Sequence, residues 1–244
     1  MLKNRTVCPE NFGRLPETDK NHVCLRLLYF REKGEKIQDD PIPARHGKLA
    51  SFQADFEKEE YQRAIDDMME YIRAGDIYIA NMTQRLFMDS RKDPYDVFRY
   101  LRSHNPSPFG AYLNYGDFQI VCASPERFLQ VRGKLREEVS LMDLIRAAFP
   151  GGSITGAPKI RAMEIIDELE HSRRGLYTGS IGYLSLDGSC DLNIVIRTAV
   201  YQDGRYHLGV GGGITCESDT EFEYEETLQK AKAIREAVYE CEAG

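Results

Sequence analysis

A glycine-rich turn runs directly into a helical pattern between Pro150 and Glu170, where the chain reads PGGSITGAPKIRAMEIIDELE. Gly151, Gly152 and Gly156 can adopt positive φ angles, so the turn can be tight. Pro158 fits the first helical turn, where no N–H partner is lost. Unpaired N–H groups and the positive end of the helix dipole then meet at one place, which suits a phosphate or a carboxylate. The apolar residues of the expected helix recur at helical spacing: Ile160, Met163, Ile166 and Leu169.

The residues after the turn decide between the two anions. Gly151 and Gly156 have the spacing of a phosphate-binding loop, GxxxxGK followed by Ser or Thr. Here Ala157, Pro158 and Lys159 follow instead, so that pattern fails. A carboxylate is therefore the better ligand, although an ordinary turn before a helix explains this stretch equally well.

Composition limits the classes of function. The net charge of −7 argues against nucleic acid as a partner, since phosphate binding needs a basic surface. No apolar run is long enough to span a bilayer, and the first residues lack the apolar region of a signal peptide. Six cysteines without a CxxC pair predict reduced thiols and a cytoplasmic location, and five dispersed histidines argue against zinc.

Periodicity becomes clear from Asp55 onward, whereas residues 1–50 show only a possible strand at Leu25–Phe30. Asp55 can cap a helix that Gly75 ends, with Tyr61, Ile65, Met68 and Ile72 as its apolar stripe. The next expected elements are a strand at Ile77–Phe87, with Thr83 and Arg85 on one face, and a helix at Pro94–Ser103.

A hairpin formed by Phe109–Asn114 and Phe118–Ala123 leads to Glu126, directly after a Ser-Pro pair. A carboxyl group near the core would have a raised pKa, which suits a general acid. Alternatively, Glu126 pairs with Arg127 or Arg85 at the end of a strand, and the spacing alone favours this structural role.

Three further strands are expected as an antiparallel meander at Tyr177–Leu186, Cys190–Tyr201 and Tyr206–Ile214. Arg197 would lie on the face opposite the aliphatic residues of its strand, either solvated or as a fork for a carboxylate. The last strand ends in GVGGGI, and so many glycines indicate that something approaches its backbone closely.

The final helix would begin at a capping box formed by Ser218 and Glu221. At about 100° per residue, Glu223, Glu226 and Lys230 share a sector next to the buried stripe. Two inward carboxylates need a cation, and oxygen ligands favour Mg²⁺ over zinc. The alternative is an acidic helix start that complements the dipole, with Lys230 as the i,i+4 partner of Glu226.

Five blocks together resemble the chorismate-utilising enzymes: SPERF, PGGSITGAPKIRAM, DLNIVIRT, GGGI and EYEETLQKAKA. That family includes component I of anthranilate synthase and of aminodeoxychorismate synthase, and the isochorismate and salicylate synthases. The resemblance runs from about Asp55 to Val238. It implies an α+β fold, with antiparallel β-sheets packed as a sandwich and helices outside, as in anthranilate synthase component I.

The PGGSITGAPK and DLNIVIRT blocks look most like aminodeoxychorismate synthase component I, whereas anthranilate synthase component I usually reads closer to LSGAPK. The resemblance therefore implies a cytoplasmic transferase that aminates chorismate in para-aminobenzoate and folate biosynthesis. It also implies Mg²⁺ as cofactor and a separate glutamine amidotransferase subunit as the source of ammonia. The alternatives are anthranilate synthase component I, which also eliminates pyruvate, and an inactive chorismate-binding regulatory subunit.

The same resemblance assigns roles to individual residues. Glu223 and Glu226 would hold Mg²⁺, which binds the ring carboxylate of chorismate. Glu126 would protonate the departing C4 hydroxyl. The substrate contacts would come from Thr155, Gly156, Tyr177, Arg197, Gly211, Gly213 and Lys230.

The chain departs from the family pattern near Val131–Gly133. In the family, a PIKGT-like motif with the active-site lysine and a helix with further metal-binding acids separate the SPERF strand from the central loop. Here FLQV runs directly into RGKLREEVS. Either part of the site is lost, or the numbering runs consecutively across a gap. Because the flanking motifs are intact, we favour a gap and expect a Cα–Cα step well above ~3.8 Å there. The expected domains are a poorly defined N-terminal region, 1–50, and a chorismate-binding catalytic domain, 51–244.

Overall fold

The computed structural model of the chain describes residues 52–133 and 135–242, with side chains up to Tyr239. All of these residues belong to one compact unit. The N-terminal region 1–50 and the expected strand at Leu25–Phe30 lie outside the described residues. None of the helices in the described ranges is long and apolar enough to cross a bilayer.

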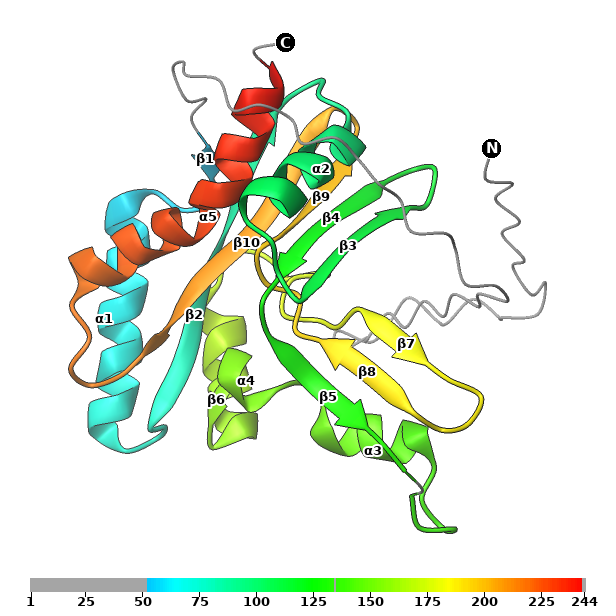
Figure 1. The fold of residues 1–244 in the computed structure, drawn as a ribbon. Coiled ribbons are helices and arrows are strands. Elements are labelled where there is room, and N and C mark those ends of the chain that lie inside the picture. Colours follow the sequence, from blue (N-terminus) through cyan, green and yellow to red (C-terminus); the bar gives the residue numbers. More distant parts are fainter. Residues whose placement is uncertain (1–51, 134, 243–244) are drawn as a thin grey trace, which may run out of the picture. The chain divides into compact units, whose positions relative to one another are not determined.

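The described chain alternates helices with mostly short strands (Figure 1). In order, the elements are β1 (Gln53–Ala54), α1 (Lys58–Ala74), β2 (Ile79–Asp89), α2 (Pro94–His104), β3 (Phe109–Asn114), β4 (Gln119–Ser124), β5 (Arg127–Val131), α3 (Leu141–Ala148), the 3₁₀ turn η1 (Gly152–Ile154), β6 (Gly156–Ala157), α4 (Lys159–Leu169), β7 (Gly182–Leu184), β8 (Cys190–Asn193), β9 (Thr198–Gln202), β10 (Arg205–Ile214) and α5 (Thr220–Glu242).

The strands form two antiparallel sheets. The larger has the order β1-β2-β10-β9-β4-β3, and β6 also pairs with β2; the smaller has the order β5-β8-β7. β2 and β10 are the longest pair and run in unbroken register from Ala80 opposite Ile214 to Asp89 opposite Arg205. The predicted α+β class with antiparallel sheets is therefore confirmed.

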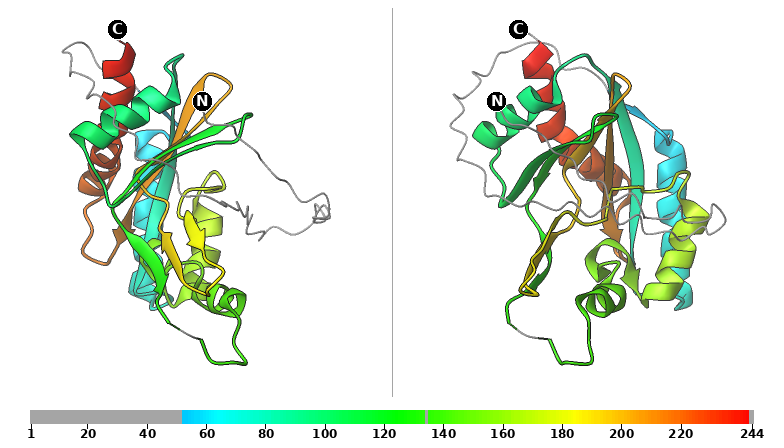
Figure 2. Two further views of the ribbon diagram at one scale, coloured as in Figure 1. Left: turned by 45° about the vertical axis from the view of Figure 1, so that its right-hand side comes forward. Right: turned by 90° about the vertical axis from the view of Figure 1, so that its right-hand side faces the viewer.

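One face of the larger sheet carries the core. Alternate residues of β2, from Ala80 and Met82 to Leu86 and Met88, are buried, so they share the face that the helices cover. α2 and α5 pack over β4 and β10, and α1 and α4 pack over β2. Both views of Figure 2 show α2 and α5 beside each other, well apart from β7 and β8.

Two helix starts differ from the sequence prediction. α1 begins after Glu57, which forms a capping box with Glu60, while Asp55 Oδ1 instead accepts a hydrogen bond from the Arg85 amide. Asp219 Oδ1 accepts from the Phe222 amide at the start of α5, so the predicted box of Ser218 and Glu221 is wrong. At α1 the nearer residue Glu57 takes the capping position expected for Asp55. At α5 the nearer residue Asp219 takes the position expected for Ser218. The predicted end of α1 at Gly75 is confirmed by its φ of 86°.

The buried face of α4 also differs from the expected stripe. Ile160 is 76% exposed and Met163 38% exposed, and Ala162 and Ile165 are buried in their place, whereas Ile166 is buried as expected. The reason is the close approach of the central loop: the Ala162 Cβ lies 2.9 Å from the point where a Cβ on Gly156 would stand. Only a small residue fits against Gly156 at position 162, and this contact sets the rotation of α4 about its axis.

The predicted strand Cys190–Tyr201 is wrong, because the chain bends between Ile194 and Arg197 and passes from β8 in the small sheet to β9 in the large one. Its neighbours β5 and β4 make the same transition, so the two strands turn together as a corner between sheets. Ser124 Oγ donates to Ile194 O at 2.6 Å and fixes the corner.

The segment after α4 crosses the outer edge of β2. His171 stacks on Phe56, and Tyr177 lies against Gly209 on the face opposite the helices. Tyr177 is therefore part of a loop, and the strand expected from it begins only at Gly182. This crossing segment, residues 170–177, connects the two faces of the sheet.

Candidate functional site

β10 has an unpaired edge where its glycines lie. β9 pairs with β10 only along Arg205–Leu208, and no described strand pairs with that edge from Gly209 onward. Lys230 Nζ donates to Gly211 O at 2.9 Å, so the free edge faces α5. Backbone groups of alternate residues point to the same edge, so the amides of Gly211 and Gly213 face the same way. Free amides beside an ammonium group can bind a carboxylate.

α5 brings two carboxylates under the same stretch of β10. Glu223 is only 9% exposed, and its Oε1 accepts from Ser218 Oγ at 2.7 Å. Glu226 Oε2 accepts from Lys230 Nζ at 2.5 Å. A Cβ on Gly212 would stand 2.8 Å from Glu223 Oε2 and 3.0 Å from Glu226 Oε2. Both acids thus face the sheet, as their helical spacing predicts, and the absence of a side chain at Gly212 makes room for them.

The donor chemistry of this pair fits magnesium. Among the described residues, no group of three or more His, Cys, Asp or Glu side chains could hold a metal ion. Mg²⁺, however, is commonly held by one or two carboxylates, with water and substrate as its other ligands. Glu223 and Glu226 satisfy that requirement, so they are the residues that would hold such an ion.

Glu126 lies at the corner between the sheets. Its backbone oxygen accepts from the Ile194 amide at 3.0 Å, and its Oε1 accepts from Ser153 Oγ at 3.1 Å. Arg127 instead pairs with Asp191 at 2.8 Å, and Arg85 donates to Arg173 O. The predicted pairing of Glu126 with either arginine is therefore wrong, and its half-buried carboxyl faces the central loop.

Tyr177 and Arg197 lie near each other at this corner. The Tyr177 ring lies directly over Gly209, where a Cβ would overlap it. Burial raises the pKa of Tyr177, while the charges of Arg174 and Arg197 oppose that rise. Arg197 is exposed and has a φ of 51°, so it is a bend residue and not, as expected, a strand residue opposite the aliphatic positions.

The central loop is bound to the outer edge of β2. Asn81 N donates to Thr155 O at 2.8 Å, and the Thr155 hydroxyl donates to Gly151 O at 2.9 Å. Gly156 has a φ of 148°, and a Cβ there would stand 2.2 Å from Ile79 O. Gly151 has a φ of −62°, so of the three glycines that could adopt positive φ only Gly156 does.

β2 and β10 separate two parts of the predicted site. β6 pairs with β2, and β2 pairs with β10, so Gly156 lies two strand spacings, about 10 Å, from the line of Gly211. Asn81 connects the parts, because it pairs with Gly213 and its Nδ2 donates to Ser153 O at 3.4 Å. Its buried Oδ1 has no hydrogen-bond partner among the described residues.

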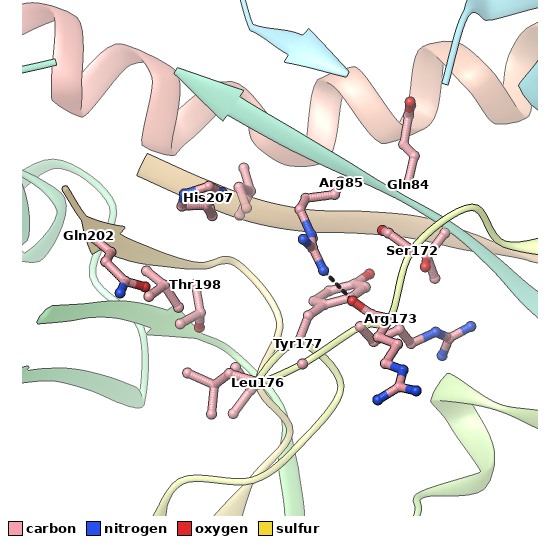
Figure 3. Close-up of a pocket in the computed structure, with 16 residues that line it drawn as sticks. Gln84, Arg85, Ser172, Arg173, Leu176, Tyr177, Thr198, Gln202 and His207 are labelled. Atoms are coloured by element: carbon pink, nitrogen blue, oxygen red, sulfur yellow. Dashed lines mark hydrogen bonds between the residues drawn. The ribbon is translucent and has the colours of Figure 1, made fainter. Parts of the chain in front are cut away.

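A cavity of about 320 Å³ lies beside Tyr177, on the face of the sheet opposite the helices (Figure 3). Figure 3 shows Arg85 pointing toward Tyr177 and the carbonyl of Arg173. His207 also lines it, and burial together with Arg85 and Arg205 lowers the pKa of this histidine. Of the predicted site residues, only Tyr177 lines this cavity.

Sequence reasoning missed Asn81, Ser153 and Gly212. Asn81 and Ser153 were inside recognised elements, but only the pairing of β2 with the central loop shows that they meet. Gly212 is one of several glycines in its strand, and its role depends on where α5 crosses β10.

The family model for chorismate binding enzymes matches residues 17–134 and 129–236. The chain belongs to the chorismate binding enzyme family. The match begins before Asp55, where the resemblance of the motif blocks begins. Its two parts meet at the join expected near Val131–Gly133.

Relatives of two kinds within the family are similar to the chain. Anthranilate synthase component 1 of Thermus thermophilus is 35% identical over 314 residues, which covers 94% of this chain and 67% of that protein. The Pseudomonas aeruginosa enzyme of the same name is 32% identical, covering 81% and 56%. Aminodeoxychorismate synthase component 1 of Bacillus subtilis is 32% identical, covering 77% and 57%. The chain thus spans between about half and two thirds of each of these proteins.

The fold is also that of a solved family member. Anthranilate synthase component I from Streptococcus pneumoniae superposes with a TM-score of 0.74 at 28% identity, covering 77% of this chain and 60% of that one. The alignment with the Thermus protein is 314 positions long, 70 more than the 244 residues of this chain. The relative therefore has residues without a counterpart here. The widened Cα–Cα step expected near Val131–Gly133 stays a prediction.

Proposed function

We propose that this chain binds chorismate with Mg²⁺ and aminates it, as an aminodeoxychorismate synthase component I. The observation that carries the proposal is the convergence of Glu223, Glu226 and Lys230 on the unpaired glycine edge of β10. A dicarboxylate needs cationic and amide partners, and its approach to two acids needs a divalent ion. Membership of the family supplies the identity of that dicarboxylate.

The proposed substrate site has two sides. On the α5 side, Lys230 and the amides of Gly211 and Gly213 receive one carboxylate, and Glu223 with Glu226 would hold Mg²⁺. The ion would supply Lewis acidity and orient the ring carboxylate. On the other side, the proposed contacts come from the corner and the central loop: Tyr177, Arg197, Thr155 and Gly156.

Glu126 is the proposed general acid. Its carboxyl would give a proton to the C4 hydroxyl, which leaves as water, while ammonia adds to the ring to give 4-amino-4-deoxychorismate. The hydrogen bond from Ser153 Oγ holds one carboxyl oxygen, so the other can face the substrate. The ammonia would come from a separate glutamine amidotransferase subunit, by analogy with component I proteins.

The choice of product rests on the central loop. The PGGSITGAPK sequence supports amination at C4, and the Bacillus relative is named aminodeoxychorismate synthase component 1. Anthranilate synthase component I is the rival function, because the Thermus and Pseudomonas relatives have that name. The two products differ by the loss of pyruvate, which makes them easy to tell apart.

A second candidate is a chorismate-binding protein without turnover. It is favoured by the two family matches that meet at 129–134, where the resemblance places a lysine-bearing segment. In this case, binding would survive and the reaction would not.

Product analysis distinguishes these functions. The purified protein is incubated with chorismate, Mg²⁺ and ammonium, and the products are separated by chromatography and identified by mass spectrometry. We expect 4-amino-4-deoxychorismate, lost in Glu126→Gln, which should still bind chorismate. Anthranilate with pyruvate would overturn the assigned product. Binding without turnover would support the second candidate, and absence of binding would refute both.

A further inference from the structure

Glu170 and Arg174 form a buried ion pair on the segment that crosses the edge of β2. Arg174 Nη2 lies 2.7 Å from Glu170 Oε1, and Arg174 Nε lies 3.0 Å from Glu170 Oε2. The Arg174 side chain is 14% exposed and the Glu170 side chain 6% exposed. A pair this buried is weak evidence for stability, because desolvation offsets much of the attraction. Its other contacts therefore indicate its role better than its charge.

Those other contacts are with the backbone of β2 and of the central loop. Arg174 Nη2 also donates to Asn81 O at 2.6 Å, and Nη1 donates to Ile154 O at 2.5 Å. Glu170 Oε1 accepts from the Thr83 amide at 3.0 Å and from its hydroxyl at 2.7 Å. One guanidinium thus connects three segments of the chain.

The pair occupies the place of a missing strand. β6 pairs with β2 at residues 79–80, and β1 pairs with it at 86–87. Between these positions, Arg174 supplies the donor for Asn81 O and Glu170 the acceptor for the Thr83 amide. These are the hydrogen bonds that a neighbouring strand would otherwise make.

We propose that Arg174, anchored by Glu170, is a positioning residue for the central loop. This inference rests on the proposed function, since the loop is where we place substrate contacts and the partner of the general acid. By holding Ile154 O, Arg174 fixes the residues on both sides of it. Thr155 stays bonded to Asn81, and Ser153 stays within reach of Glu126.

The shape of the guanidinium makes this role testable. A lysine at 174 would keep a positive charge beside Glu170 but lacks the planar fork that reaches Ile154 O and Asn81 O together. Arg174→Lys should therefore loosen the loop while the ion pair, and with it the fold, is kept. Arg161→Lys is the matched control, because Arg161 lies on α4 and pairs at the surface with Asp76 and Glu164.

Two measurements on the whole chain test the role. Amide hydrogen exchange of residues 152–157 and of Asn81 should become at least about tenfold faster in Arg174→Lys, with exchange in the β3–β4 hairpin unchanged. Chorismate affinity with Mg²⁺ should fall at least about tenfold. Arg161→Lys should leave both values at those of the unmodified chain.

The outcomes separate this inference from the proposed function. If the unmodified chain binds chorismate and Arg174→Lys binds equally well with unchanged exchange, the positioning role is overturned. If the unmodified chain does not bind chorismate, the proposed function fails, and the exchange rates still decide whether Arg174 holds the loop. Glu170→Gln, which retains an acceptor for Thr83 but not the charge, gives the same comparison should Arg174→Lys not fold.

Discussion

The lack of a side chain at Gly212 determines where two carboxylates can lie. A Cβ there would come within 3.0 Å of both Glu223 Oε2 and Glu226 Oε2, and 3.7 Å from Lys230 Nζ. The inward direction of the two acids could be predicted from helical spacing alone. The role of Gly212 could not, because it depends on the crossing of α5 over β10, which no local pattern encodes.

Gly212→Ala should therefore impair the site more than the fold. The added methyl group meets only the ends of flexible side chains, which can move aside, so the free energy of unfolding should change by less than about 1 kcal/mol. Moving those carboxylates should weaken Mg²⁺-dependent chorismate binding at least about tenfold, or ~1.4 kcal/mol. Calorimetric titration and denaturant unfolding measure the two effects.

Gly110→Ala is the control for this substitution. A Cβ on Gly110 would make ordinary contacts of 3.5 Å or more, and Gly110 lies on β3, away from α5. Chorismate affinity should be unchanged in this variant. Equal chorismate affinity in Gly212→Ala and the unmodified chain would show that Glu223 and Glu226 do not take part in binding.

Elements with strong local signals were predictable, and those fixed by tertiary contacts were not. The β3–β4 hairpin and the end of α1 at Gly75 follow from turn residues and were found as expected. The bend at Ile194–Arg197 is hidden in the sequence, because Leu192, Ile194 and Ile196 continue an alternating pattern. Two hydrogen bonds fix the bend, one from Ser124 Oγ to Ile194 O and one from the Ile194 amide to Glu126 O. Both partners of Ile194 are distant from it in the sequence.

β10 also carries a titrating group, His207, on the face lined by the cavity. Burial lowers the pKa of His207, and the charges of Arg85 and Arg205 lower it further, while Asp89 opposes them. The unfolded chain therefore takes up this proton at higher pH than the folded chain. The free energy of unfolding should be insensitive to this group above its unfolded pKa, about 6.5, and should fall as the pH drops below that value.

His207→Gln should remove that part of the acid sensitivity. Denaturant unfolding at a series of pH values from neutral to mildly acidic compares the variant with the unmodified chain. The difference between their unfolding free energies should be constant near neutral pH and should shift in favour of the variant on acidification. A difference that does not depend on pH would contradict the assigned environment of His207.

On the scale of the whole molecule, the sequence was sufficient for the fold class and the family but not for the assembly of the site. The motif blocks could be recognised one by one, yet the crossing of residues 170–177 from one face of the sheet to the other was unforeseen. That crossing places Tyr177 over Gly209 and the Glu170–Arg174 pair between β6 and β1. The site is therefore a property of how distant segments meet at β2 and β10.

Calorimetric titration of chorismate, with and without Mg²⁺, into the chain and its Glu223→Gln/Glu226→Gln variant tests the central claim most directly. We predict saturable binding that requires Mg²⁺ in the unmodified chain and is weakened at least about tenfold in the variant, with an unchanged unfolding midpoint. Equal binding without Mg²⁺, or equal binding by the variant, would contradict the account.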